Sequence, residues 1–480
     1  MLFNSMIFVL FAAVFFAAWP FMRRRNDTRW IYLTVMSLVF YGWWRWDFLG
    51  LLILNGAVNY YAALGMERWP LRRRLMLGVS LAVNLGTLVV FKYRDFGIAN
   101  ANWLLAALGA EWSVPAPEKV LPVVGISFYT FQAMSYTIDV YRGQLKPTHN
   151  IFHFFAFLSL FPQLVAGPII RAATLLPQLE TRRPTTESER WEAAKLIAVG
   201  FFRKMVVADT VAPVVRAAIH AQQADGSCLY WWAVMLLFTY QIYCDFSGYS
   251  DIARGLGRLM GYDFPVNFNH PYISASFREF WQRWHISLST WFRDYVYIPL
   301  GGSKLGAARS LVCLWITMLV SGLWHGANWT FVAWGACHAF YLTIERFTRW
   351  PERLTRVPAV GRHVTVLVVF LLTVVSWVFF VSRSMEQAFV ILGSMFNFAN
   401  LGLEQAREAV SGGPLNVVLI MILAELWFHF RLDRARLLSR LGPTPERLGR
   451  RVLAPIGIAL LLCAAVYLRG PGSVFIYFQF

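Results

Sequence analysis

Residues 311–336 read LVCLWITMLVSGLWHGANWTFVAWGA, a run that contains no Asp, Glu, Lys or Arg. An apolar run of this length predicts a membrane-spanning segment, because about 20 such residues cross a bilayer. His325 lies inside the run. An ionisable imidazole is costly in a membrane unless it faces a wet cavity lined by protein, so His325 is a candidate functional residue.

The whole chain has the composition of a membrane protein. Of its 480 residues 58% are hydrophobic and 15% are charged, whereas a soluble protein carries roughly 25% charged residues. Apolar runs recur from end to end, and the expected spans are 2–21, 30–44, 48–65, 75–91, 120–140, 151–170, 191–208, 229–246, 310–328, 330–345, 364–382, 414–430 and 452–468. The sequence therefore predicts an all-α polytopic membrane protein with a single domain, residues 1–480.

The net charge of +18 is carried by short basic clusters between the apolar runs, at 23–25, 72–74, 182–183 and 431–451. This is the positive-inside pattern, and such clusters also attract anionic lipid heads. No basic and aromatic face of the kind that stacks bases is present, so we expect the bilayer and not nucleic acid as a partner. The basic loops 346–362 and 431–451 flank the non-basic loop 384–413. The C-terminus and the end of the span that carries His325 are then predicted to be external. The basic cluster 23–25 follows the first apolar run, which predicts an external N-terminus as well.

The stretch 248–310 interrupts the pattern of spans. Residues 263–271, DFPVNFNHP, are typical of turns. Residues 276–295 carry aromatic and leucine side chains at spacings of three and four, which predicts one amphipathic helix. We expect 248–310 to form an interfacial or re-entrant segment within the domain.

Four residues around His325 and earlier in the chain are candidates to line a cavity with it: Ser321, Trp324, Asn328 and Asp245. Ser321 precedes His325 by one helical turn, and Asn328 and Trp329 follow it by nearly one, so a continuous helix would place them on one face. A neutral imidazole there could take a proton from a hydroxyl. The alternative is a packing histidine that is hydrogen-bonded to a neighbouring helix.

His285 and Asp245 have plainer interpretations. His285 lies at the edge of the aromatic stripe in WQRWH, where an interfacial histidine is common. Asp245 and Asp251 frame CDFSGYSD at the end of an apolar run, a pattern typical of a helix cap followed by a turn; an acidic group that faces a cavity is the alternative.

Familiar active-site motifs are missing from the sequence. It has no G-x-S-x-G, no P-loop and no G-x-G-x-x-G, and its five cysteines lack metal-ligand spacing. We expect no metal site and no bound cofactor. A general-base mechanism is the most economical hypothesis.

Long stretches of the chain match one family. They are LPVVGISFYTFQAMSYTIDVYRG (121–143), FPQLVAGPIIR (161–171), YCDFSGYSDIARGLGRLMGYDFPVNFNHPY (243–272), FREFWQRWHISLSTWFRDYVYIPLGG (277–302) and SGLWHGANWTFVAWG (321–335). On these motifs the chain resembles the membrane-bound O-acyltransferases. Within that family it is similar to the bacterial branch typified by the membrane subunit of alginate O-acetylation.

The resemblance implies a ring of roughly 11–13 transmembrane helices around a thinned central cavity. It implies that His325, in the Trp-His-Gly motif, is the catalytic histidine, and that His285 is a second functional histidine, which positions a thioester or stabilises an oxyanion. It also implies a protein of the bacterial inner membrane that passes an acetyl group from acetyl-CoA, as a substrate, toward an exopolysaccharide. The expected partner is a periplasmic or membrane-anchored acetyltransferase, and the aromatic tail 475–480 is either its docking element or an interfacial anchor.

Two alternatives stay open at this point. The first remains in the family and transfers D-alanine from a carrier protein toward teichoic acid. The second belongs to another class, a transporter or proton-relay protein that uses His325 and Asp245, for which a polar membrane midplane would be suitable.

Overall fold

The computed structural model describes residues 1–115, 123–164, 167–181, 183–221, 226–304, 306–357, 360–411, 416–423, 454–473 and 475. Across these residues the secondary structure is helical and contains no strand, which confirms the predicted all-α class. The chain divides into two compact units. The first comprises Met1–Ala193 and Ala253–Pro265, and the second comprises Ala194–Ile252 and Val266–Phe480.

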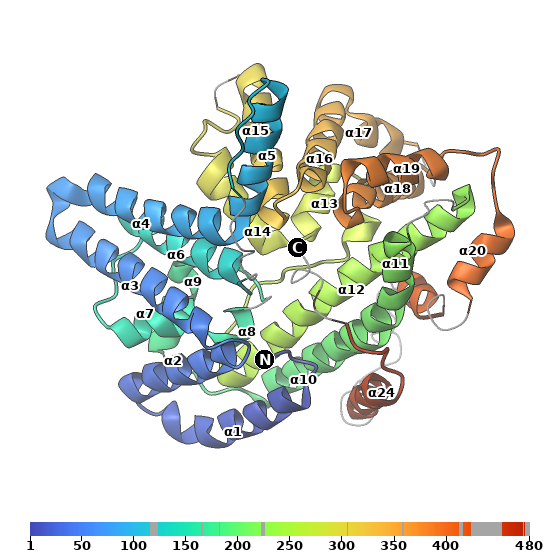
Figure 1. Ribbon diagram of the computed structural model, residues 1–480. Helices are drawn as coiled ribbons and strands as arrows, with labels where there is room; N and C mark the ends of the chain where they lie inside the picture. Colours follow the sequence, from blue (N-terminus) through green and yellow to red (C-terminus); the bar gives the residue numbers. More distant parts are fainter. Residues whose placement is uncertain are drawn as a thin grey trace. The chain divides into compact units, whose positions relative to one another are not determined.

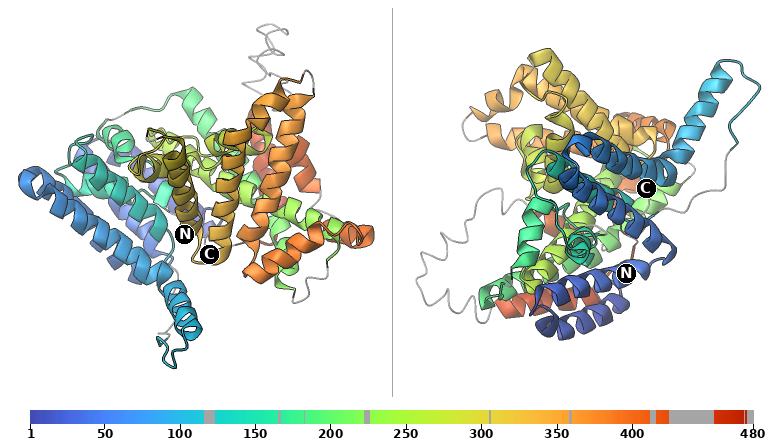
Figure 2. Two further views of the ribbon diagram at one scale, coloured as in Figure 1. Left: turned by 90° about the horizontal axis from the view of Figure 1, so that it is seen from above. Right: turned by 90° about the vertical axis from the view of Figure 1, so that its left-hand side faces the viewer.

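The first unit is built on a packed group of three helices, α3 (Asp47–Arg68), α4 (Arg73–Leu88) and α6 (Ile126–Tyr141). α3 and α4 lie side by side (Figure 1). A π-helical segment, Val89–Tyr93, joins α4 to α5 (Arg94–Ala107), which bends away from the α3–α4 pair (Figure 2). The other helices of this unit are α1 (Met6–Met22), α2 (Asn26–Gly42), α7 (Ile151–Leu158), α8 (Phe161–Leu164) and α9 (Ala172–Glu180).

Polar side chains form a buried network between α3, α4 and α6. We call this set the asparagine network: Asn55, Asn59, Ser80, Asn84 and Thr137. Its members hydrogen-bond to one another, for example from Ser80 Oγ to Asn59 Oδ1 at 2.7 Å and from Asn84 Nδ2 to the same oxygen at 2.9 Å. Amide and hydroxyl groups of this kind hold helices together where lipid supplies no hydrophobic driving force.

The expected single span at 151–170 is wrong. α7 ends at Leu158, and α8 begins only at Phe161. Pro162 has no N–H to donate to the preceding turn, so a continuous helix through this point would lose a hydrogen bond. The freed N–H of Phe161 instead donates to Ser37 Oγ at 3.0 Å.

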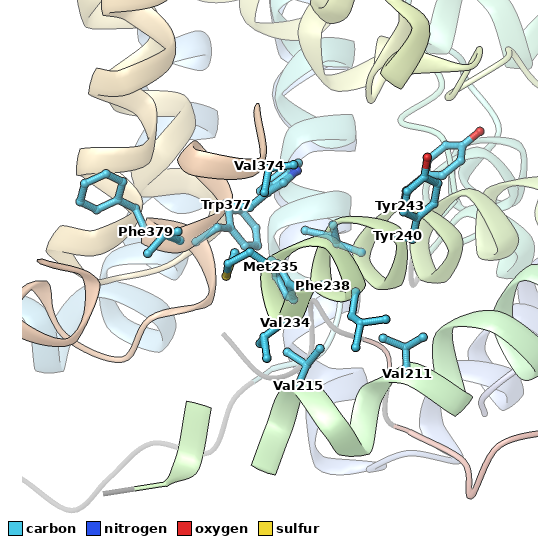
Figure 3. Packing of buried hydrophobic residues seen from close by; sticks show 14 of the residues in the cluster. Val211, Val215, Val234, Met235, Phe238, Tyr240, Tyr243, Val374, Trp377 and Phe379 are labelled. Atoms are coloured by element: carbon cyan, nitrogen blue, oxygen red, sulfur yellow. The ribbon is translucent and has the colours of Figure 1, made fainter. Parts of the chain in front are cut away.

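The second unit contains most of the helices that follow α10 (Glu187–Phe201): a π-helical segment (Phe202–Ala208), α11 (Asp209–His220), α12 (Cys228–Met260), α13 (Phe277–Arg283), α14 (Ile286–Phe292), α15 (Ala307–His325), α16 (Trp329–Thr348), α17 (Trp350–Thr355), α18 (Gly361–Val381), α19 (Met385–Met395), α20 (Leu403–Val410) and α24 (Ala454–Tyr467). α10 and α12 have residues in both units. A large apolar cluster joins α11, α12, α16 and α18. Figure 3 shows Val234 and Phe238 of α12 beside Val215 of α11, all within this cluster.

The expected end of a span at residue 246 is wrong, because α12 continues to Met260. Gly248 does not end the helix. A Cβ at Gly248 would lie 2.7 Å from the carbonyl oxygen of Gly200, so the two glycines allow α10 and α12 to approach closely. The irregular stretch therefore begins at Gly261, whose φ of 94° is in the left-handed region.

Four helical segments of the described residues are long and apolar enough to cross a membrane: Asp47–Arg68, Pro70–Ala107, Ala307–His325 and Gly361–Val381. Several other expected spans correspond to helices that are shorter or interrupted, such as Met6–Met22. Most of the expected span 414–430, the basic loop 431–451 and tail residues 476–480 lie outside the described residues.

Candidate active site

α15 and α16 form the helical hairpin that carries the Trp-His-Gly motif. The two helices replace the expected spans 310–328 and 330–345, and they pack along each other. The two backbones lie close together at Gly322 and Gly335. A Cβ at Gly322 would lie 2.2 Å from the carbonyl oxygen of Phe331, and one at Gly335 would lie 2.3 Å from that of Met318. The glycines of this motif therefore allow the two backbones to come close together.

His325 is the last residue of α15, and Gly326 begins the turn to α16. A Cβ at Gly326 would lie 2.1 Å from the ring of Phe331, so this turn also needs glycine. Asn328 is the N-cap of α16: its side chain accepts from Thr330 N at 3.1 Å and donates to the carbonyl oxygen of Arg383 at 3.0 Å. The prediction that Asn328 shares a continuous helical face with His325 is wrong, because the helix ends between them.

Aromatic side chains of three helices surround the buried ring of His325. Its ring centroid lies 4.9 Å from that of Trp324, 5.0 Å from that of Trp334 on α16 and 5.3 Å from that of Phe380 on α18. Ser321 is also buried and lies one turn before His325 on α15. The packing of three elements onto one imidazole fixes its orientation, as an active site requires.

His285 lies at a break in the chain. The expected continuous helix 276–295 is wrong: α13 ends at Arg283, α14 begins at Ile286, and His285 between them has a φ of 41°. A non-glycine residue in the left-handed region is uncommon, although histidine is among the residues that tolerate it. Such conformations cost of order 1–3 kcal/mol and concentrate at functional sites.

The break turns the His285 side chain into the interior. The residue is fully buried, and its ring lies 4.5 Å from that of Phe246 and 6.1 Å from that of Phe268. Nδ1 lies 3.2 Å from Oδ1 of Asn267. His285 is outside the four helical segments that are long and apolar enough to cross a membrane. Burial lowers the pKa of its imidazole to about 3, so the ring is neutral at physiological pH.

Trp324 connects the two histidines. The centroid of its ring lies 4.9 Å from that of His325 and 6.1 Å from that of His285. The structure thus brings together the two histidines and the tryptophan that the sequence singled out. At this site the two imidazoles lie next to the apolar ring of Trp324.

Asp245 lies inside α12 and belongs to a separate ionic cluster. We call this set the lysine cluster: Lys204, Asp209, Asp245 and Ser473. Lys204 Nζ lies 2.7 Å from Oδ1 of Asp209 and 2.8 Å from Oδ1 of Asp245, and it donates to the carbonyl oxygen of Ser473 at 3.0 Å. The interpretation of Asp245 as a helix cap is therefore wrong, because its carboxylate is paired with a buried lysine.

Sequence reasoning did not single out Asn267, Lys204 or His338. Asn267 holds His285, and the signal that could have found it is an amide between Val266 and Phe268 in an otherwise apolar context. Lys204 follows Arg203 near the end of the expected span 191–208, which also contains Lys195. His338 is fully buried, its ring lies 4.9 Å from that of Trp334, and its Nε2 lies 3.1 Å from Ser376 Oγ.

Comparison with known proteins places this site in a family. Residues 142–385, which include both histidines, match the model of the membrane-bound O-acyltransferase family. The chain belongs to this family. It is 38% identical to the probable alginate O-acetylase AlgI of Pseudomonas putida, over an alignment that covers 100% of both chains.

Two other relatives carry different names. The chain is 31% identical to the peptidoglycan O-acetyltransferase of Helicobacter pylori, over 78% of this chain and 75% of that protein. It is 32% identical to the teichoic acid D-alanyltransferase of Streptococcus thermophilus, over 50% of this chain and 61% of that protein. The protein is a multi-pass membrane O-acyltransferase, as the sequence predicted.

Proposed function

We propose that this O-acyltransferase passes an acetyl group from a cytoplasmic thioester, acetyl-CoA, across the membrane for O-acetylation of an exopolysaccharide such as alginate. The single observation that carries the proposal is the meeting of His325 and His285 at the buried ring of Trp324. The similarity along the whole chain to a probable alginate O-acetylase supports the acetyl group and the glycan.

In the proposed reaction His325 is the general base. Its imidazole takes the proton from an acceptor hydroxyl, the oxygen attacks the thioester carbonyl, and the CoA thiolate leaves and is protonated by the imidazolium. A positioned base contributes about 10²–10⁴-fold to the rate. Orientation of the thioester against the hydroxyl contributes further.

The proposal assigns the two sides of the membrane. Acetyl-CoA is made in the cytoplasm and is too polar to cross lipid, so only its acetyl group needs to pass. The basic loop 346–362 is assigned to the cytoplasm and both termini to the periplasm of a bacterial inner membrane. A periplasmic or membrane-anchored acetyltransferase is the proposed partner that completes transfer to the glycan.

The test measures release of free CoA from labelled acetyl-CoA by purified protein in lipid nanodiscs. Wild type is compared with His325→Ala and His285→Ala, with and without candidate acceptors. His149→Ala is the matched control, because the His149 side chain is 72% exposed. We expect cleavage in wild type and His149→Ala and a loss in His325→Ala. Equal CoA release by all four proteins would reject the acetyl-CoA mechanism.

D-alanyl transfer toward teichoic acid is the second candidate. The observation that favours it is the 32% identity to a teichoic acid D-alanyltransferase, but that similarity covers only half of this chain. Acetyl-CoA is preferred because the match to the probable alginate O-acetylase extends over the whole chain. Activity with a D-alanyl carrier protein and none with acetyl-CoA would reverse this preference. The transporter hypothesis is not retained, since the chain belongs to an acyltransferase family.

A further inference from the structure

The contacts of Asn267 allow the proton on His285 to be placed. Asn267 is buried, and its Nδ2 lies 3.1 Å from Ser250 Oγ. Its Oδ1 accepts from the Ser287 hydroxyl at 2.9 Å and from the Ser287 backbone N–H at 3.2 Å, and it lies 3.2 Å from His285 Nδ1. Its backbone carbonyl accepts from the N–H of Ile286 at 2.9 Å. Asn267 thus holds both the start of α14 and the imidazole that precedes it.

A backbone N–H fixes which way the Asn267 amide points. The nitrogen and oxygen of an asparagine side chain are told apart only by their partners. The Ser287 N–H can only donate, so the Asn267 atom that faces it must be the oxygen. That same oxygen faces His285 Nδ1. Two acceptors would repel each other at this distance, so Nδ1 must carry a hydrogen.

We propose that Asn267 is a positioning residue that holds His285 as the neutral tautomer with its proton on Nδ1, so that Nε2 is left as a hydrogen-bond acceptor for a donor group of the bound substrate. This inference rests on the proposed function. Nε2 is buried and has no hydrogen-bond partner within the part of the chain that the structure describes. A buried acceptor without a partner is costly, so a ligand O–H or N–H is the expected partner.

The position of the proton decides whether His285 can donate a hydrogen bond to the substrate or accept one from it. An oxyanion is stabilised by hydrogen-bond donors that point at it. A neutral ring protonated on Nδ1 offers a lone pair at Nε2 and no donor. His285 therefore accepts a hydrogen bond, from the acceptor hydroxyl or from an amide N–H of the thioester substrate. The oxyanion role implied by the family resemblance does not fit this tautomer.

The surroundings of His285 favour the neutral ring. The rings in contact with it are those of Phe246, Phe268 and Trp324, and none is charged. The adjacent titratable residues on the elements that supply these contacts are Asp245 on α12, which is paired with Lys204, and His325 on α15. The nearby charged residue Arg283 pairs with Glu279 and donates to the carbonyl oxygen of Asn269.

The first test reads the proton directly, by solid-state NMR of protein labelled with ¹³C,¹⁵N-histidine in lipid. Nδ1 correlates with Cγ and Nε2 with Cδ2, so the spectrum identifies the nitrogen that carries the proton. The signals of His285 are those missing from His285→Asn. Asparagine tolerates the left-handed backbone and keeps a donor toward Asn267. We expect a protonated Nδ1; a protonated Nε2 would overturn the proposal whether or not the enzyme accepts acetyl-CoA.

The second test is the pH profile of Asn267→Asp. Aspartate has nearly the same shape, Ser250 can rotate its hydroxyl to donate, and the carboxylate would favour the imidazolium form of His285. We expect kcat/KM to fall as the pH is lowered, with this acid limb about 1–3 pH units above any limb of wild type. Higher activity at acid pH would show that His285 acts as a donor. An unmoved profile in an active variant would show that Asn267 does not control the ring.

The KM values for the two substrates identify which of them donates the hydrogen bond to His285. His285→Asn removes Nε2, because the shorter side chain has no atom at that position, and it keeps a donor toward Asn267. A rise of KM for acetyl-CoA would assign the donor to the thioester arm, and a rise of KM for the hydroxyl substrate would assign it to the acceptor. Unchanged kcat and KM for both substrates would overturn the proposal. An inactive wild type would instead reject the proposed function and leave the NMR result standing.

Discussion

The asparagine network of the first unit and the histidine site of the second are both polar groups buried among apolar helices. In the asparagine network every buried polar side-chain atom has a protein partner, such as Asn55 Nδ2 on Asn84 Oδ1 at 3.1 Å and Ser80 Oγ with Thr137 Oγ1 at 2.8 Å. In the histidine site Nε2 of His285 has none among the described residues. A polar network whose members all hydrogen-bond to one another stabilises helix packing. A buried acceptor without a protein partner, next to aromatic side chains, indicates that a ligand binds there.

The largest expected effect is a loss of catalytic rate on substitution in the histidine site. His325→Ala removes the proposed base and should lower kcat/KM about 10²–10⁴-fold, which corresponds to roughly 3–5 kcal/mol in the activation barrier. Its midpoint of thermal unfolding in nanodiscs should fall only in part, because the truncation leaves a cavity among the surrounding aromatic rings, while the molecules that remain folded lose their activity. Steady-state kinetics and calorimetry on the same preparation check this. A variant that unfolds at room temperature would show that His325 is required for folding.

In the lysine cluster the charge of Lys204 is paired with two carboxylates, so we expect the cluster to have a structural role. Lys204→Met would leave the carboxylates of Asp209 and Asp245 buried without their partner, and loss of one partner of a buried pair costs about 3–5 kcal/mol. The midpoint of thermal unfolding should fall, and the segment around Ser473 should become easier to cleave by protease. Lys304→Met, at an exposed lysine, is the control. Equal stability of the two variants would contradict the assignment.

The close packing of α15 against α16 is tested by a substitution at Gly322. In Gly322→Ala the added Cβ would lie 2.2 Å from the carbonyl oxygen of Phe331, and overpacking of this kind costs about 1–3 kcal/mol. We expect lower stability together with a lower rate, since α15 carries His325 at its end. Gly393→Ala meets nothing within 4 Å and should be tolerated. Wild-type unfolding of Gly322→Ala would show that α15 and α16 are not held this close.

The smallest expected effect lies in the asparagine network. Asn59→Leu removes the oxygen that accepts from Ser80 and Asn84, and hydrogen bonds between membrane helices contribute about 1–2 kcal/mol. Stability should fall by this amount while kcat per folded molecule stays unchanged. Folded protein is quantified by size-exclusion chromatography before the assay. A selective loss of kcat in this variant would break the distinction between closed and open polar groups.

The sequence predicted the features that depend on local pattern. Apolar length located α15, α16 and α18, and the placement of a histidine in an apolar run identified His325. The prediction that Asn328 shares a helical face with His325 was wrong, because hydrophobicity does not reveal that Gly326 begins a turn. The same limit applies to His285: the aromatic spacing continues through residue 285, while the chain turns at a single left-handed residue.

Features that depend on distant partners could not be predicted. Asp245 resembles a helix cap until Lys204 is placed beside it, and these two residues belong to different helical segments. Asn267 sits in a turn-like stretch, and its role becomes visible only when Ser250, His285 and Ser287 surround it. Contacts of this kind are set by tertiary packing, which a single sequence does not display.

Acetyl transfer across the membrane at the histidine site can be measured in sealed proteoliposomes. Labelled acetyl-CoA is enclosed in the lumen, the acceptor is supplied outside, and protein orientation is determined by protease accessibility. We expect acetylated acceptor outside and free CoA inside with wild type, and neither with His325→Ala. Acetylated product formed at the same rate by both proteins, or only when donor and acceptor share one side, would contradict it.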